Sequence, residues 1–143
     1  MVGSPSEILR RGYSDQEVKD IYAFGRYLFG AGRLNDARAV FEAVSNIVPS
    51  FLPGWLGLCA VQVQIGNKEQ AVSAARHAYR LGPDYPLVIL FLIIALLGTG
   101  DYTAAGSYLG ELGEKVDAGM VNDTRLVRLY RAQISRYRAG IKI

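Results

Sequence analysis

The most constraining feature of this chain is a repeat with a spacing of 34 residues. A glycine and an alanine each recur three times at this spacing, at Gly32, Gly66 and Gly100 and at Ala37, Ala71 and Ala105. Pro83 also has a counterpart, Pro49, one period earlier. A period of this length is typical of arrays of helical hairpins. The sequence therefore predicts a repeat protein built from stacked helix pairs.

The repeated residues have a physical role in such a hairpin. A glycine lets the chain turn tightly between two helices. A small alanine lets the two helix backbones approach closely. Each hairpin has an apolar face that it cannot bury alone, so neighbouring hairpins stack. The residues of the middle copy resemble the tetratricopeptide repeat (TPR) pattern, and they are Trp55, Leu58, Gly66, Ala71, Ala78 and Pro83.

Caps, breakers and apolar spacing predict the helices. Ser14 and Glu17 form a capping box, which begins a helix that should run from residue 15 to residue 30. Asn35 or Asp36 should open its partner helix, which Pro49 ends. The remaining helices are expected at 53–65, 68–81, 86–97, 102–116 and 122–139. A short helix at 5–11, capped by Ser4, is expected before them.

These expectations give an all-α fold, with three TPR hairpins in a right-handed superhelix. The chain of 143 residues is predicted to be a single domain. An N-terminal segment occupies residues 1–13, and the repeats occupy 18–51, 52–85 and 86–119. A basic capping helix follows at 120–143. This last segment has six basic residues and one acid, so it carries +5, while the rest of the chain carries −2.

Composition limits the function classes. Half of the residues are apolar and a fifth are charged, which argues against a disordered chain. The first residues lack the apolar core of a signal peptide. The apolar run from Leu87 to Leu97 is shorter than the roughly 20 residues that span a bilayer, and it indicates a buried helix. The single cysteine, Cys59, excludes an intramolecular disulfide and fits a reducing compartment such as the cytoplasm.

The sequence contains no catalytic constellation. His77 is the only histidine, which excludes a multi-histidine metal site, and it is expected on the surface. Cys59 is expected to be a packed small apolar residue. Glycines are scattered at turns and helix ends rather than gathered in a phosphate-binding loop. We therefore predict a protein that is not an enzyme, with no cofactor, no metal and no small-molecule substrate.

The remaining candidate is a protein-binding surface. In TPR arrays the first helix of each hairpin lines a groove. Mapping that face onto the three copies gives an apolar groove made of Tyr22, Arg26, Phe29, Leu56, Ala60, Val63, Leu90, Phe91, Ile94 and Leu97. Two occupants of this groove are open: the C-terminal helix folded back into it, or a protein partner. The partner, as an amphipathic helix or an extended apolar segment, is favoured. Leu90→Glu or Ile94→Glu should then abolish binding while helical content survives.

The run from Ser14 to Leu112 is similar to a narrower TPR group, the chaperones of bacterial type III secretion. The residues that carry this resemblance include Ile21-Tyr22, Gly25, Phe29, Phe41, Trp55-Leu56-Gly57-Leu58, Gln62, Leu81 and Pro86, besides the repeated glycines, alanines and prolines. The resemblance implies a cytoplasmic chaperone without ATPase activity, which holds a needle subunit or a translocator until export. It also implies a homodimer or a heterodimer. The apolar run Phe91-Leu92-Ile93-Ile94 favours a groove that holds a helix, or self-association.

Two other functions remain open. One is a TPR scaffold that stays in an assembled complex as a permanent subunit. The other is binding to nucleic acid or a membrane surface by the basic tail, where Arg125, Arg128 and Arg131 broadly share a face. A solvated helix face explains these arginines better, so nucleic-acid and membrane partners are disfavoured.

Overall fold

The computed structural model describes residues 12–141. The described part contains helices and no strand. The helices are α2 (Asp15–Gly30), α3 (Leu34–Ile47), α4 (Leu52–Ile65), α5 (Lys68–Leu81), α6 (Pro86–Thr99), α7 (Tyr102–Asp117) and α8 (Thr124–Ile141). The all-α prediction is confirmed, and each predicted helix from residue 15 onward is present. The short helix expected at 5–11 lies outside the described residues.

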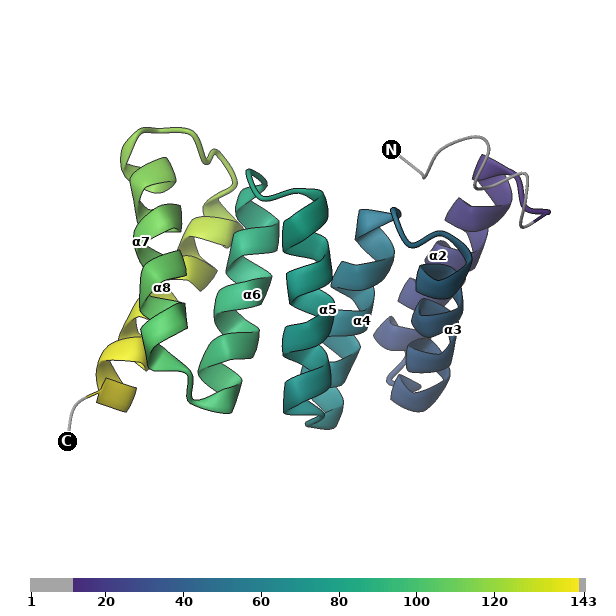
Figure 1. Ribbon diagram of the computed structural model, residues 1–143, viewed down its shortest axis with the longest axis horizontal. Coiled ribbons are helices and arrows are strands. Elements are labelled where there is room, and N and C mark those ends of the chain that lie inside the picture. Colours follow the sequence, from purple (N-terminus) through teal and green to yellow (C-terminus); the bar gives the residue numbers. More distant parts are fainter. Residues whose placement is uncertain (1–11, 142–143) are drawn as a thin grey trace.

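The helices form hairpins that stand side by side in chain order, from α2 and α3 at one end to α7 and α8 at the other (Figure 1). The hairpins are α2–α3, α4–α5 and α6–α7, and each packs on the next. We call α2, α4 and α6 the A helices, and α3, α5 and α7 the B helices. The A helices also contact one another along the array, α2 with α4 and α4 with α6. The A helices therefore share one side of the molecule.

The repeated residues have the roles that their spacing predicted. Gly32, Gly66 and Gly100 have φ angles of +78°, +97° and +81°, a conformation that residues with a side chain rarely adopt. Each of these glycines follows an A helix and turns the chain toward its B helix. The repeated alanines, Ala37, Ala71 and Ala105, are buried in the core where A and B helices meet.

Local caps explain where several helices begin. The Ser14 hydroxyl accepts a bond of 3.1 Å from the Glu17 amide, and the Glu17 carboxylate accepts one of 2.9 Å from the Ser14 amide. Prolines in the first turn start α4 and α6. Asp123 caps α8 by accepting from the Arg125 amide at 2.9 Å. Helix α8 thus begins directly after Asp123, at Thr124.

Helix α6 is apolar all round because other helices enclose it. It contacts α4, α5, α7 and α8. Its buried residues are Val88, Ile89, Leu90, Leu92, Ile93, Ala95, Leu96 and Leu97. The sequence predicted that one side of this helix would need a partner. Most of its apolar surface is instead buried against other helices of this chain. Only a narrow strip of α6 is left for contact with a partner.

Helix α8 packs on α6 and α7 as the A helix of a further hairpin would. Tyrosine rings lie directly on glycines at this contact. A Cβ atom on Gly113 would be 2.6 Å from the Tyr130 hydroxyl oxygen, and one on Gly106 would be 2.8 Å from that of Tyr137. Gly140 of α8 in turn accommodates the ring of Tyr102. The glycines are therefore required for α8 to dock this closely.

Candidate peptide-binding groove

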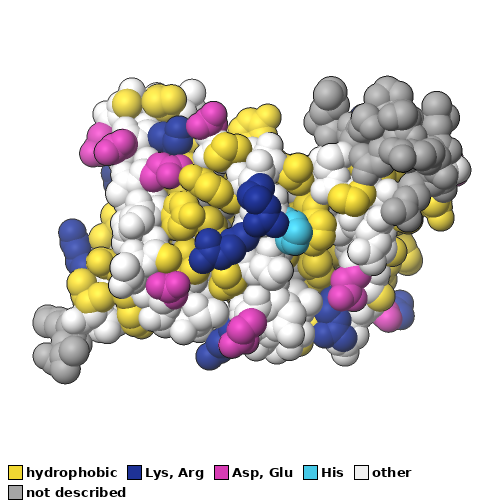
Figure 2. Space-filling model, viewed as in Figure 1, with side chains coloured by type: hydrophobic (Ala, Val, Ile, Leu, Met, Phe, Trp, Pro, Cys, Tyr) yellow, Lys and Arg dark blue, Asp and Glu magenta, His cyan; other side chains and the backbone are white. Residues whose placement is uncertain are grey.

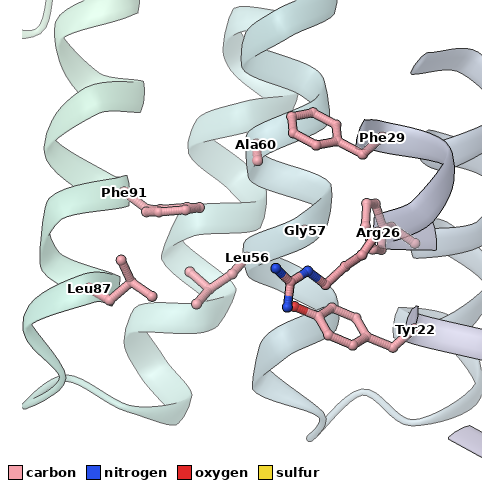
Figure 3. Close-up of a pocket in the computed structure, with 9 residues that line it drawn as sticks. Tyr22, Arg26, Phe29, Leu56, Gly57, Ala60, Leu87 and Phe91 are labelled. Carbon is pink, nitrogen blue, oxygen red and sulfur yellow. The ribbon is translucent and has the colours of Figure 1, made fainter. Parts of the chain in front are cut away.

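Two adjoining pockets lie on the side of the A helices. The first pocket has a volume of about 290 Å³ and is lined by Tyr22, Arg26, Phe29, Phe41, Leu56, Gly57, Ala60, Leu87 and Phe91. The second pocket has a volume of about 180 Å³ and is lined by Phe29, Cys59, Ala60, Val63, Gln64, Phe91 and Ile94. They share Phe29, Ala60 and Phe91. We call the two pockets together the groove, and Figure 3 shows the first of them.

The floor of the first pocket depends on two helical glycines. A Cβ atom on Gly25 of α2 would lie 2.7 Å from Cε1 of Phe41, and one on Gly57 of α4 would lie 2.6 Å from the same atom. The Phe41 ring of α3 thus fills the space that two side chains would need. Tyr22 packs on this ring, with the centroids 5.8 Å apart. The close approach of α2, α3 and α4 builds the pocket.

The width of the groove is set at Ala60. Figure 3 shows Phe29 of α2 and Phe91 of α6 on either side of this alanine of α4. All three residues are half-buried. A larger residue in place of Ala60 would fill the space between the two rings. The groove is therefore a pair of apolar hollows that meet at a narrow point between two aromatic side chains.

Eight of the ten residues that were predicted to line the groove do so. The two exceptions are Leu90 and Leu97. Those two leucines are 0% and 5% exposed and belong to the core, so their placement in the groove was wrong. On α6 the residues that line the groove are Leu87, Phe91 and Ile94, at steps of four and three. One residue of helix turns a side chain by about 100°, which carries Leu90 away from Phe91 and into the core.

The groove residues that the sequence did not predict include Leu87, Gly57 and Gln64. Leu87 is 44% exposed, and it holds the position that Leu90 was expected to hold. It lies one turn before Phe91, so helical spacing counted back from Phe91 would have found it. Gly57 and Phe41 offered no such signal, because their place in the pocket depends on how three helices meet.

The predicted alternative occupant of the groove, the C-terminal helix, is not there. None of the residues of α8 lines either pocket, and α8 contacts α6 and α7 instead. The arginines predicted as a basic surface, Arg125, Arg128 and Arg131, are exposed on α8. They lie outside the groove. The groove therefore stays uncovered by the described part of the chain.

The lining contains one charged group, Arg26, which is exposed. Within residues 12–141 it has neither a hydrogen bond nor an acidic side chain within 4.0 Å. The ion pair that the described residues do form is between Arg33 and Asp36, 2.6 Å apart. The groove is thus an apolar surface with a single cation at its edge.

No group in the groove is set up for chemistry. Burial raises the pKa of the Cys59 thiol to about 12, so the thiol stays protonated and is a poor nucleophile. Within the described residues, no group of histidine, cysteine and carboxylate side chains could hold a metal ion. The groove can bind apolar side chains, and its residues offer no acid, base or nucleophile for a reaction.

His77 lies outside the groove, on α5, and packs on the single tryptophan. Its ring stacks on Trp55 with centroids 4.1 Å apart, and an Arg80 nitrogen lies 2.9 Å from its Nδ1. Arginine can only donate, so Nδ1 accepts and the imidazole is neutral. Figure 2 shows basic side chains gathered beside this histidine at the middle of the face. His77 is half-buried, not fully on the surface as the sequence suggested.

We expect His77 to titrate below pH 6.5. Burial lowers its pKa, and so does the positive charge of Arg80. A protonated imidazole stacked on an indole quenches its fluorescence, so Trp55 emission should fall with a midpoint below pH 6.5. Because the unfolded chain binds the proton more readily, stability should fall as the pH drops below 6.5. Arg80→Gln should raise the midpoint, and a midpoint at or above 6.5 in the unmodified protein would contradict this assignment.

No protein-family model matches the chain. The chain is 32% identical over 87 residues to the anaphase-promoting complex subunit cut9 of Schizosaccharomyces pombe. That match covers 61% of this chain and only 13% of the length of cut9. The chain thus corresponds to a small part of a much longer protein.

Solved structures match over nearly the whole chain. The type III secretion translocator chaperone SycD of Yersinia enterocolitica aligns with a TM-score of 0.76 and 20% identity, over 96% of this chain and 99% of that one. PcrH of Pseudomonas aeruginosa, solved with the chaperone-binding region of PopD, aligns with a TM-score of 0.75 and 22% identity, over 90% and 94%. This chain has the fold of these chaperones. The predicted resemblance is confirmed at the level of structure.

Another structure of SycD contains a peptide of the translocator YopD. Its TM-score to this chain is 0.75, over 89% of this chain and 94% of SycD. In the described residues, no helix is long and apolar enough to cross a bilayer. The solved structures thus share with this chain an array of helical hairpins, in which the A helices line one side.

Proposed function

We propose that this chain is a non-enzymatic chaperone of a bacterial type III secretion system, which acts in the cytoplasm. It holds an apolar segment of an export substrate, a translocator or a needle subunit, in the groove until export. The observation that carries the proposal is the apolar groove that residues 12–141 leave open across all three A helices. Its end-to-end likeness to chaperones solved with translocator peptides supports the same reading.

The mechanism is burial of apolar side chains. An export substrate with an exposed apolar segment aggregates unless that segment is covered. The groove offers Tyr22, Phe29, Leu56, Leu87, Phe91 and Ile94 as apolar contacts. Apolar surface removed from water contributes about 25 cal/mol per Å² to the free energy of binding, before the entropy cost of ordering the segment is subtracted. No energy source is needed, because release follows when the secretion machinery binds the substrate more tightly.

Co-expression tests the proposal. We would express the affinity-tagged chain together with each secretion substrate encoded near its gene, and measure capture by mass spectrometry and solubility by sedimentation. The expected result is one stable complex, in which the substrate is insoluble without this chain. Light scattering of that complex and of the free chain would also test the predicted homodimer or heterodimer. If every substrate remained soluble and uncaptured, the chaperone function would be wrong.

A second candidate function is supported by the similarity to an anaphase-promoting complex subunit. A scaffold of this kind would remain in an assembled complex rather than release its partner. A pulse-chase measurement separates the two functions. A chaperone loses labelled substrate once secretion is induced, whereas a scaffold keeps its partner at constant stoichiometry.

Binding of nucleic acid or membrane by Arg125, Arg128 and Arg131 is a weaker candidate. The three arginines are exposed, but steps of three residues spread them around α8 rather than along one line. Affinity of this kind would fall steeply with salt. The groove lies elsewhere, so substitution of the three arginines should leave capture of the export substrate unchanged.

A further inference from the structure

Arg26 is the charged residue of the groove that the proposed function does not use. It lies on the same face of α2 as Tyr22 and Phe29, at steps of four and three residues. Figure 3 shows its side chain reaching from α2 toward α4, over the first pocket. The second pocket does not include it. The cation is therefore placed at one end of the groove.

While the groove is empty, Arg26 carries no desolvation penalty, because water hydrates its guanidinium. An apolar segment laid over the first pocket removes that water from a charge without a partner among residues 12–141. Desolvating an unpaired charge is costly, and a carboxylate brought by the segment removes the penalty. The planar guanidinium accepts a carboxylate with two parallel hydrogen bonds. An occupant that is entirely apolar would thus bind less well than one with an acid at this point.

We infer that the groove selects apolar segments in which an aspartate or glutamate side chain accompanies the residue in the first pocket and pairs with Arg26. A second apolar side chain would fill the second pocket, beyond Phe29 and Phe91. This inference rests on the proposed function and names the chemistry of its substrate.

A displayed library of random peptides tests the inference without a known client. Each peptide is fused at its C-terminus to the coat protein, so it offers no terminal carboxylate. Peptides selected on the unmodified protein should carry an acid beside a large apolar residue. Selection on Arg26→Glu should give lysine or arginine at that place. Arg26 is exposed, and circular dichroism would verify that the variant is folded.

Synthetic versions of the selected peptides give the decisive measurement. Arg26→Glu should weaken an acidic peptide about tenfold. Changing the acid of that peptide to lysine should restore its affinity for the variant, which a purely structural role of Arg26 would not do. If the selected peptides lack an acid, or if Arg26→Glu binds them unchanged, Arg26 only covers apolar surface with its stem and the inference is wrong.

A different result would reject the proposed function itself. The binding of every selected peptide should be abolished by Ile94→Glu, a change at the other end of the groove. If no peptide is selected, or if Ile94→Glu leaves binding intact, the groove is not the binding site, and the proposed function and the inference fail together. If Ile94→Glu abolishes peptide binding but the selected peptides show no preference for an acid near Arg26, the inference is wrong and the proposed function is retained.

Discussion

Ile94→Glu is expected to abolish capture of the proposed export substrate while the protein stays folded. Ile94 is half-buried and lines the second pocket, where an apolar side chain of the substrate would cover it. A carboxylate at this place is solvated in the free protein and loses water on binding. We expect affinity to fall at least about 100-fold, which corresponds to about 2.7 kcal/mol. Calorimetry measures the affinity, and circular dichroism measures the helical content.

Leu129→Glu is the matched control, since it makes the same kind of change on an exposed residue of α8, outside both pockets. It should bind the substrate like the unmodified protein. For Leu90→Glu the structure predicts a different result from the one expected from the sequence. Leu90 is completely buried, so a carboxylate there should unfold the chain instead of blocking the groove. Capture by a folded Ile94→Glu protein would show that the substrate binds elsewhere.

Phe41→Ala is expected to produce the largest loss of stability among single substitutions in the first hairpin. The ring is 1% exposed and lies against Gly25 and Gly57, which have no side chains to expand into the space. Truncation of a buried phenylalanine costs about 3–5 kcal/mol. For a chain of this length, that lowers the midpoint of thermal unfolding by roughly 10–20 °C. Urea unfolding monitored by circular dichroism measures the free energy.

Phe24→Ala provides the control for that change. Phe24 lies on α2 like Gly25, and its side chain is 54% exposed. Its truncation removes the same atoms without opening a cavity, so the free energy of unfolding should change by less than about 1 kcal/mol. Equal losses for Phe41→Ala and Phe24→Ala would mean that Phe41 does not hold the three helices together.

Much of the fold could be predicted from residues with a fixed local meaning. Gly32, Gly66 and Gly100 are required by the backbone angle of a turn, whatever surrounds them. The capping box at Ser14 and Glu17 depends on four consecutive residues alone. Such signals are local, and the structure follows them to within two residues at most helix ends.

The groove was harder to predict because its shape depends on packing between helices. A repeat of 34 residues carries Leu56 to Leu90, yet Leu56 lines the groove and Leu90 is buried. The two positions differ in which neighbours enclose the helix, and the sequence does not encode that locally. The glycines that contact Phe41 can be seen in the sequence, but their role depends on how α2, α3 and α4 pack together.

The enclosure of α6 by α8 has a consequence for synthesis on the ribosome. The most apolar helix of the chain leaves the exit tunnel before residues 124–141 exist to cover it. The nascent chain therefore exposes part of α6 to solvent and to other proteins for the time needed to make and release α8. During that interval the chain itself has an exposed apolar surface, which is covered only when α8 docks.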